Sequence, residues 1–265
     1  MTTEREQAIA EAADRLTTAA VKREPCSPVR DLLGTTDIRS AYEVQRCLNA
    51  RRTDVVTGRK IGLTSPAVQK QLGVDQPDFG VLFADMDVSA LDEVPTTRLL
   101  QPKVEAEIAF LLATDLDGDD LDLAAVRAAV AYAMPALEIV DSRVADWDIT
   151  ITDTVADNAS SGLYVLGESR LPLKAFEPRE ATMRMYVDDV LVSEGTGAAC
   201  LGDPLNALLW LARTAREYGD PLRAGQVVLS GALGPMAGVS PGVTVLAEIS
   251  TLGTVTAAFT DKEPS

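Results

Sequence analysis

Histidine is absent from all 265 residues of this chain, and cysteine occurs only three times. Without imidazole, the chain cannot form a Ser-His-Asp or Cys-His catalytic group, a histidine-ligated zinc site or a histidine general base. Any chemistry must therefore use carboxylates, lysine, tyrosine, hydroxyl groups, backbone groups or a metal held by oxygen atoms. Oxygen ligands suit hard divalent cations such as Mg²⁺, Mn²⁺ or Ca²⁺.

The three cysteines, Cys26, Cys47 and Cys200, are far apart and show no C-x-x-C spacing. An odd number of scattered thiols is typical of a reducing compartment and predicts no disulfide framework. The N-terminus lacks the continuous apolar stretch of a signal peptide, and no apolar run approaches the roughly 20 residues that span a bilayer. We therefore expect a cytoplasmic protein with no membrane partner.

Basic residues are scarce, because 24 Lys and Arg stand against 40 Asp and Glu, for a net charge of −16. Such a surface repels polyanions, which argues against nucleic acid and anionic membranes as partners. Hydrophobic residues make up 46% of the chain, which is enough for a sizeable core in one large domain.

The beginning of the chain is predicted to be helical and the rest is mainly β. Apolar residues recur at spacings of three and four over residues 3–22 and 37–52, which indicates two amphipathic helices, the second with Thr36 as its N-cap. From Val55 onward, short apolar runs alternate with glycine, and no repeat or clear linker interrupts them. We therefore predict an α+β protein with an N-terminal helical section, residues 1–54, and one catalytic body, residues 55–265.

The body is expected to contain three further helices and a hairpin. A proline begins the predicted helices at residues 66–72 and 204–217, and Asp203 is the predicted N-cap of the second. A third helix is expected at residues 123–134, where Pro135 would end it. Two apolar runs separated by Asp188 and Asp189 predict a β-hairpin.

Two glutamates lie two residues apart in the apolar run Gln101-Pro-Lys-Val-Glu-Ala-Glu-Ile-Ala-Phe-Leu-Leu112. Side chains alternate along a strand, so Glu105 and Glu107 share one face, with their Cβ atoms roughly 6 to 7 Å apart. Two half-buried anions at that distance disfavour joint ionisation unless a cation compensates them. The pair alone leaves open a solvated strand face as the alternative to a cation site.

A third glutamate, Glu138, lies between Leu137 and Ile139 in the β-like run after Pro135. Three glutamates in strand-like apolar contexts form a plausible set of oxygen ligands, with further positions for water and substrate. The acidic loop at residues 115–122 does not form a calcium-binding EF-hand. Its glycine is in the fourth position and not in the sixth, where an EF-hand needs it. Acids before a helix are the better explanation for that loop.

Three further segments contain candidate residues, each with a structural alternative. Lys60 is flanked by Ile61 and two glycines, which allow the backbone close to a ligand, but an exposed strand lysine has the same pattern. Asp78 lies among proline, glycine and aromatics, where turn capping is the other explanation. The glycine-rich turn at residues 230–234 either offers N–H groups to a substrate carboxylate or forms only a tight bend. The polar segment at residues 152–162 either lines a pocket or is an ordered loop.

Several ordered motifs together resemble the 2-keto-4-pentenoate hydratases, which belong to the fumarylacetoacetate hydrolase superfamily. The resemblance extends from about residue 36 to residue 260. It is carried by Gly58-Arg-Lys-Ile-Gly-Leu-Thr-Ser65, Gln71-Leu-Gly-Val-Asp-Gln-Pro-Asp-Phe-Gly80, Glu105-Ala-Glu107, Pro135-Ala-Leu-Glu138, Asp153-Thr-Val-Ala-Asp-Asn-Ala-Ser160 and Leu229-Ser-Gly-Ala-Leu-Gly-Pro-Met236.

The resemblance implies a mixed β-roll or barrel-like fold of the fumarylacetoacetate-hydrolase C-terminal type, a Mg²⁺ or Mn²⁺ ion, and a homo-oligomer, either a pentamer or a decamer, which could associate with pathway neighbours. It implies Glu105, Glu107 and Glu138 as the metal ligands. Lys60 and Asp78 match the positions of proton-transfer and substrate-contacting groups, and Ser160 lies in the pocket motif. The same motifs indicate contacts with substrate at Ile61, Gly62, Leu63, Gly231, Ala232 and Leu233.

The implied reaction is the hydration of 2-hydroxypenta-2,4-dienoate, also called 2-keto-4-pentenoate, to 4-hydroxy-2-oxopentanoate in meta-cleavage degradation of aromatic compounds. The alternatives are a hydratase for 2-hydroxyhexa-2,4-dienoate from steroid degradation, a 2-oxo-3-hexenedioate (4-oxalocrotonate) decarboxylase, and a non-catalytic partner subunit. The segment Asp75-Gln-Pro-Asp-Phe-Gly80 resembles the hydratases more than the decarboxylases. Hydrolysis of a C–C bond as in fumarylacetoacetate hydrolase fits less well, because that branch resembles a histidine-assisted mechanism and this chain has no histidine.

Overall fold

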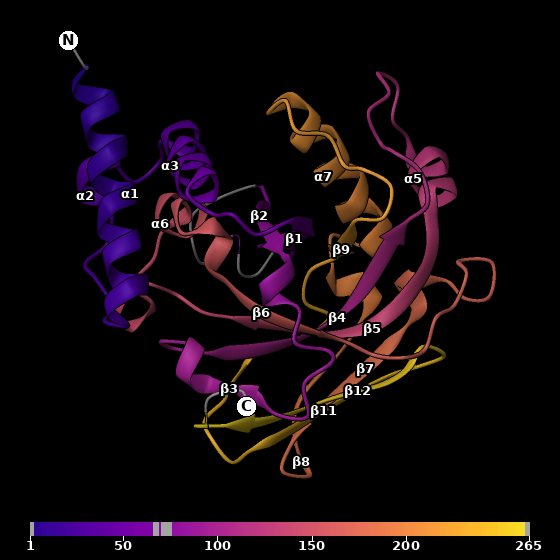
Figure 1. Ribbon diagram of the computed structural model, residues 1–265. Coiled ribbons are helices and arrows are strands. Elements are labelled where there is room, and N and C mark those ends of the chain that lie inside the picture. Colours follow the sequence, from indigo (N-terminus) through magenta and orange to yellow (C-terminus); the bar gives the residue numbers. More distant parts are fainter. Residues whose placement is uncertain (1–2, 66–68, 70–75, 263–265) are drawn as a thin grey trace.

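Two β-sheets and a group of helices form an α+β fold, as predicted (Figure 1). The computed structural model describes residues 3–65, 69 and 76–262. Apart from Gln69, the helix predicted at residues 66–72 lies outside these residues, as does the first half of the motif at residues 71–80. The larger sheet is strongly curled, and the site described below lies on it.

The N-terminal helices are α1 (Glu4–Lys22), α2 (Arg30–Leu33) and α3 (Ile38–Ala50). Thr3 and Glu6 cap the start of α1 reciprocally, as a capping box. The predicted N-cap of α3 is wrong by one residue: the cap is Asp37, and its carboxylate accepts a hydrogen bond from the Ser40 N–H at 3.0 Å. A second bond, from the Ser40 hydroxyl at 2.6 Å, explains why Asp37 takes this position.

The larger sheet has seven strands in the order β2-β1-β9-β4-β5-β6, with β10 paired to β4. Its longest pairing is the antiparallel one between β4 and β5, and the apolar face of β4 points into the core, as predicted. The strands are β1 (Val56–Gly62), β2 (Asp78–Phe83), β4 (Lys103–Leu112), β5 (Val130–Val140), β6 (Ser161–Leu166), β9 (Val227–Leu229) and β10 (Ala237–Gly238).

The helix predicted at residues 123–134 is too long. Helix α5 (Leu123–Ala129) is followed directly by β5, in which Pro135 lies opposite Ile108 of β4. The apolar spacing over this segment fits a helix, but pairing with β4 over ten positions overrides local helix preference from Val130 onward. The strand Val130–Val140 therefore delivers Glu138 to the sheet.

The smaller sheet has five strands in the order β3-β12-β11-β7-β8. The hairpin predicted at Asp188 and Asp189 is confirmed: both residues have positive φ values, 47° and 64°, as a two-residue hairpin turn requires. The strands are β3 (Val94–Pro95), β7 (Thr182–Val187), β8 (Val190–Thr196), β11 (Thr244–Ile249) and β12 (Gly253–Thr260).

The remaining helices lie in the connections between strands. Helix α7 (Pro204–Glu217) begins after Asp203, whose side chain accepts a hydrogen bond from the Leu205 N–H at 2.9 Å, as predicted. Helix α6 (Ile151–Ala156) lies near α3. Short 3-10 helices are η1 (Ala84–Met86), η2 (Thr96–Arg98), η3 (Ala145–Trp147), η4 (Asn158–Ser160), η5 (Pro178–Glu180) and η6 (Gly197–Ala199).

The helical section shares its core with the body. Ile9 and Leu16 of α1 belong to the same buried apolar cluster as Val104 of β4. In addition, the buried Gln45 side chain of α3 donates hydrogen bonds to the Phe79 and Val155 carbonyls, at 2.9 and 3.0 Å. The helices therefore brace β2 and α6, and the boundary between residues 54 and 55 stays a prediction.

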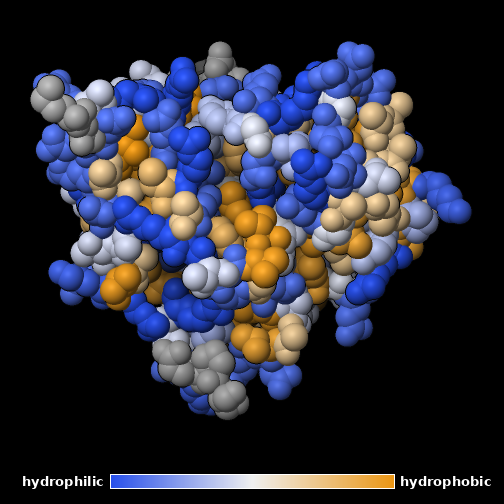
Figure 2. Space-filling view, turned by 45° about the horizontal axis from the view of Figure 1, so that its top comes forward, coloured by the Kyte–Doolittle hydropathy of each residue, from blue (hydrophilic) through white to orange (hydrophobic). Residues whose placement is uncertain are grey.

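The surface agrees with the composition. Hydrophilic side chains cover much of the face in Figure 2, and apolar ones gather near its middle. Among the described helices, none has the length and apolar character that crossing a membrane requires.

Candidate metal centre and active site

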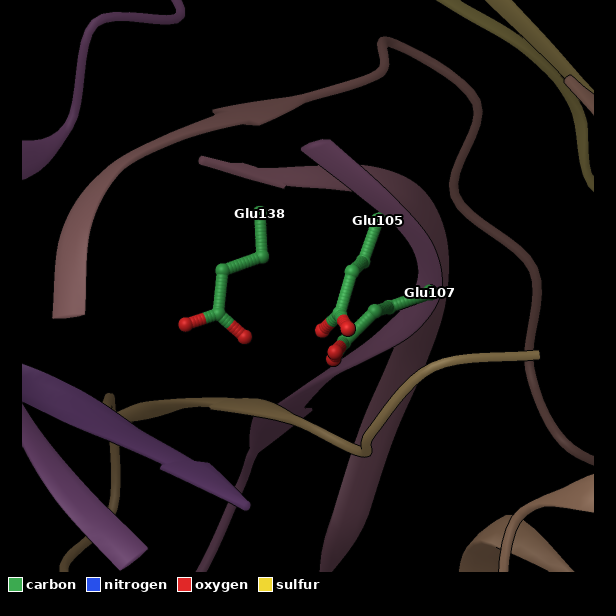
Figure 3. Close-up of side chains that lie close together, drawn as sticks. All are labelled: Glu105, Glu107 and Glu138. Carbon is green, nitrogen blue, oxygen red and sulfur yellow. The ribbon is translucent and has the colours of Figure 1, made fainter. Parts of the chain in front are cut away.

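Three glutamates converge at the centre of the larger sheet. Glu105 of β4 and Glu138 of β5 are direct partners in the antiparallel register, and Glu107 follows two residues later on the same face of β4. Their carboxylates point toward one another (Figure 3). One oxygen of each lies within 4.8 Å of the others, so the structure brings together the three residues chosen from the sequence.

The carboxylates lack partners that would satisfy their oxygen atoms. Glu107 and Glu138 are only 0% and 1% exposed. The Gly231 N–H donates to one Glu107 oxygen at 2.8 Å, but the other oxygen of Glu107 and both of Glu138 accept no hydrogen bond from the described residues. Buried unpaired oxygens are costly, and a hard divalent cation with oxygen ligands fits them. We conclude that the chain contains a divalent-metal site.

Lys60 of β1 is the cation nearest to this cluster among the described residues. Its Nζ atom lies 2.9 Å from Oε1 of Glu138, an ion pair without the alignment of a hydrogen bond. Burial by itself would lower the pKa of Lys60, but Glu138 and Asp78 outweigh it, and the pKa is raised. Lys60 is therefore a cation at neutral pH.

One lysine does not neutralise the cluster. Burial, followed by repulsion from Glu138, raises the pKa of Glu105 to about 7 and that of Glu107 well above its ordinary value. A bound divalent cation would lower these pKa values, because it favours the charged carboxylates. The electrostatics and the unpaired oxygens therefore both favour a metal.

Asp78 begins β2 directly beside this cluster. It pairs with Gly62 of β1, and a Cβ atom at Gly62 would lie only 2.2 Å from the Asp78 carboxylate, so any other residue there would displace this carboxylate. Asp78 is 1% exposed, and one of its oxygens has no described partner. Burial raises the pKa of Asp78 although Lys60 opposes the shift, so this carboxyl holds a proton more readily than an exposed one.

Ser160 reaches the site from a strained segment. Three consecutive residues of η4, Asn158, Ala159 and Ser160, have positive φ values of 52°, 53° and 51°. Hydrogen bonds between the Asn158 side chain and the Val81 backbone, at 2.8 and 2.9 Å, help to hold this conformation. The Ser160 hydroxyl lies 3.2 Å from that of Thr154, which in turn donates to Asp78 at 3.4 Å. Non-glycine residues keep such φ values only where their surroundings enforce them.

A pocket of about 230 Å³ joins these groups. Six residues chosen from the sequence line it: Lys60, Gly62, Leu63, Asp78, Glu105 and Ser160. Larger hollows lie elsewhere on the molecule, but this one is lined by Glu105 of the cluster and by Asp78, one oxygen of which has no described partner.

The other residues expected to contact substrate lie outside the lining of this pocket. Ile61 is buried in the core, and Leu233 is buried there too. The N–H of Gly231 is occupied by Glu107, and the N–H of Leu233 donates to the Ala106 carbonyl at 3.0 Å. The turn thus supports the glutamates, and direct contacts of Ile61, Gly231, Ala232 and Leu233 with substrate stay predictions.

Several pocket residues were not chosen from the sequence, notably Lys103, Trp147 and Met236. Alternation along β4 could have revealed Lys103, since it lies two residues before Glu105 on the same face. Trp147 and Met236 come from irregular segments far along the chain, so no periodic pattern indicates that they meet.

Comparison with known proteins agrees with the fold and the site. The family model for the C-terminal domain of fumarylacetoacetate hydrolase matches residues 59–260. The chain belongs to this family. It is 55% identical to a protein of Pseudomonas putida described as TodF product hydratase, and the match covers 97% of both chains. It is 50% identical to a 2-keto-4-pentenoate hydratase of Burkholderia vietnamiensis, over 97% of this chain and 99% of the other.

Within the family, these full-length matches place the chain with the 2-keto-4-pentenoate hydratases, which are hydro-lyases. A solved structure of 4-oxalocrotonate decarboxylase from Pseudomonas putida G7, complexed with magnesium and adipate, has the same fold, with a TM-score of 0.89. It is 32% identical, and the match covers 96% of this chain and 98% of the other. The predicted family and fold type are confirmed.

Proposed function

We propose that this protein adds water to 2-hydroxypenta-2,4-dienoate and forms 4-hydroxy-2-oxopentanoate, in meta-cleavage degradation of aromatic compounds. The observation that carries the proposal is the buried cluster of Glu105, Glu107 and Glu138, with oxygens that no described group satisfies, in a chain that groups with 2-keto-4-pentenoate hydratases. These three side chains would hold Mg²⁺ or Mn²⁺. When bound, the metal would act as a Lewis acid toward the oxygen atoms of a 2-oxo acid.

The reaction needs proton transfers on both sides of the water addition. First, the 2-hydroxyl group of the dienol loses a proton and C5 gains one, which gives 2-oxopent-3-enoate with an electrophilic C4. Water then forms a bond from its oxygen to C4, loses a proton, and C3 gains one. The groups that act must therefore stabilise negative charge at the 2-oxygen and move protons near C3 to C5.

Lys60 and Asp78 supply these two functions. Lys60 remains a cation beside Glu138, so it can donate a hydrogen bond to the 2-oxygen as negative charge develops there. Asp78 is buried and has a raised pKa, which makes it a stronger base than an exposed carboxylate and suits it to remove the proton of the attacking water. The hydroxyls of Thr154 and Ser160 form the polar wall next to Asp78.

The decisive experiment follows dienol absorbance and CO₂ release with purified protein and Mg²⁺. The substrates are 2-hydroxypenta-2,4-dienoate, 2-hydroxyhexa-2,4-dienoate and 2-oxo-3-hexenedioate. We expect hydration without CO₂, with the highest kcat/KM for the five-carbon dienoate. Glu138→Gln should be inactive, and Lys174→Gln, which changes an exposed residue away from the pocket, should behave as the unchanged protein.

Each other outcome supports a different function. The fold similarity to 4-oxalocrotonate decarboxylase makes decarboxylation the second candidate, and CO₂ release from the hexenedioate without hydration would establish it. A higher kcat/KM for the six-carbon dienoate would establish the longer-chain hydratase. No turnover of any of the three would favour a non-catalytic partner subunit.

We further propose that the protein assembles into a pentamer or a decamer of identical chains. The resemblance to the hydratases supports this, and light scattering coupled to size-exclusion chromatography measures it. A monomer at assay concentration would contradict it. Association with enzymes of neighbouring steps is a separate expectation, which co-elution with those enzymes would test.

A further inference from the structure

A second lysine, Lys103 of β4, lines the same pocket as Lys60. Lys103 is two residues before Glu105 on β4 and is the direct partner of Val140 on β5, two positions along from the Glu105–Glu138 pair. Lys60 and Lys103 are the two cations among the described residues that line the pocket. Lys60 is paired with Glu138, whereas Lys103 forms no ion pair with the described carboxylates within 4.0 Å.

The Lys103 ammonium is held by an aromatic ring. Its Nζ atom lies 4.3 Å from the centroid of the Trp147 ring, a cation–π contact. The Trp147 Nε1–H donates to the Gln101 carbonyl at 3.0 Å, so the residue two positions before Lys103 anchors the ring that holds it. The Gln101 side chain in turn donates to the Val144 carbonyl and accepts from the Asp146 N–H, both at 2.8 Å.

The segment that presents Trp147 is strained. Asp146 and Trp147 have positive φ values of 58° and 55°, although neither is glycine. Consecutive residues in this conformation cost free energy, and such strain persists where the surrounding hydrogen bonds enforce it. The bonds from Gln101 do so here, and they fix the ring at the pocket. The placement of Trp147 over Lys103 is therefore built into the fold.

The excess of negative charge at the pocket indicates what Lys103 binds. Four carboxylates, those of Glu105, Glu107, Glu138 and Asp78, face one lysine at the inner end, so negative charge is in excess even with a divalent cation present. The whole chain also carries a net charge of −16. A substrate carboxylate entering this site needs a further cation, and Lys103 is the cation lining the pocket that forms no ion pair within 4.0 Å among the described residues.

We propose that Lys103, held against Trp147, binds the carboxylate of the substrate and so turns its 2-oxygen toward Lys60. The proposal rests on the proposed function for the class of ligand, a 2-oxo or 2-hydroxydienoic acid. Lys103 thereby selects acids whose carboxylate lies next to the reacting oxygen, and Trp147 is the residue that positions it.

Binding is measured in a Trp210→Phe background, where Trp147 is the single tryptophan and its fluorescence reports on the site. The probes are 2-oxopentanoate, its primary amide and 2-oxohexanedioate, each with Mg²⁺ at saturation. We expect Lys103→Gln to raise the Kd of 2-oxopentanoate about tenfold or more, because a charge-assisted hydrogen bond is lost. Lys103→Arg should keep the Kd within about threefold, and the Kd of the amide should change less than about twofold in either variant.

Three controls separate this role from a structural one. Lys103→Gln should bind Mg²⁺ as tightly as the unchanged protein or more tightly, because a positive charge beside Glu105 is removed. In the hydration assay its KM should rise while kcat changes much less, since the lysine is assigned to binding. Lys174→Gln serves as the matched loss of a lysine away from the pocket, and its Kd values should be unchanged.

An unchanged Kd for 2-oxopentanoate in Lys103→Gln would overturn the proposal, and so would equal weakening of the acid and the amide. Weakening confined to 2-oxohexanedioate would overturn it too and would assign Lys103 to a second, distal carboxylate. A protein that binds these probes as expected but hydrates no dienoate would instead refute the proposed function.

Discussion

The chain has two dense groups of acidic residues, and they differ in every property that matters for binding a metal. One is the cluster of Glu105, Glu107 and Glu138 on the curled sheet. The other is the acidic loop, residues 115–122, which connects β4 to α5. The loop contains more carboxylates, five in eight residues, but metal binding is expected only at the cluster.

The difference lies in exposure and in the cations nearby. In the acidic loop, Arg223 lies 2.8 Å from both Asp115 and Asp117, and Arg216 pairs with Asp119. Asp122 caps α5 and accepts a hydrogen bond from the Ala125 N–H at 2.7 Å. These acids are satisfied by arginine, backbone and solvent, as the sequence predicted for a helix start.

The glutamate cluster has the opposite surroundings. Three of its oxygens are buried and accept no hydrogen bond from the described residues, two strands fix their positions, and Lys60 is the one lysine paired with the cluster within 4.0 Å among those residues. The comparison teaches that a rigid, desolvated arrangement with too few partners marks a metal site better than the number of carboxylates does.

The largest expected effect is the loss of a cluster carboxylate. Glu138→Gln keeps the shape but removes the charge of the residue that faces both Glu105 and Lys60. We expect kcat/KM to fall by at least about a thousandfold, which corresponds to about 4 kcal/mol of transition-state stabilisation. Calorimetric titration with Mn²⁺ should show binding lost with it. Activity within tenfold of the unchanged protein would contradict the role of the cluster.

The next largest effects concern the two groups assigned to charge and proton movement. Lys60→Ala and Asp78→Asn should each lower kcat by about a hundredfold to ten-thousandfold, the range for loss of a positioned acid or base. Asp78→Asn should still bind Mn²⁺, since Asp78 is not one of the three converging glutamates. Turnover that is undiminished in both variants would refute the assignment.

Much of this site could be predicted from sequence, and the reasons are local. Alternation along β4 places Glu105 and Glu107 on one face whatever the rest of the chain does. The exact register that sets Glu138 opposite Glu105 could not be read in the same way, because it depends on β5 starting at Val130, inside a segment with a helical pattern. Lys60 and Asp78 meet through β1–β2 pairing, and only the family motifs indicated it.

The rest of the pocket depends on irregular backbone. Ser160 and Trp147 are placed by backbone segments with positive φ values. These values could not be predicted from the sequence, because neither segment has glycine at those positions. Those conformations are enforced by hydrogen bonds to distant elements, such as those between Asn158 and Val81 and between Gln101 and Asp146. The spacing of residues along the chain does not predict such contacts, because they form between segments that meet only in the folded structure.

A smaller effect should appear in the stability of the metal-free protein. The pKa of Glu105 is raised to about 7 from its ordinary 4.5, so the folded chain binds more protons than the unfolded chain between these values. Stability from this group is therefore complete below about pH 4.5 and declines, by on the order of 2 kcal/mol, as the pH rises through 7. Melting temperatures at pH 5.5 and 7.5 test this, with Glu105→Gln as the control in which the dependence should be weaker, because Glu107 also has a raised pKa.

The same melting temperatures can be measured with added Mn²⁺. Because the metal binds the ionised carboxylates, its stabilising effect should be greater at pH 7.5 than at pH 5.5, and binding should release protons. Equal stabilisation by Mn²⁺ at both pH values would show that Glu105 is already ionised at pH 5.5.

The smallest effect is expected at the acidic loop, and it completes the comparison. Asp115 accepts a hydrogen bond from the Ala224 N–H at 2.8 Å and pairs with Arg223, and both contacts lower its pKa, but the group is exposed. Exposed ion pairs are weak and are screened by salt, so Asp115→Asn should shift the melting temperature by less than about 2 °C. Its Mn²⁺ affinity and kcat/KM should equal those of the unchanged protein. A loss of tightly bound Mn²⁺ in this variant would mean that the loop is a second metal site, and that exposure does not separate the two acidic groups.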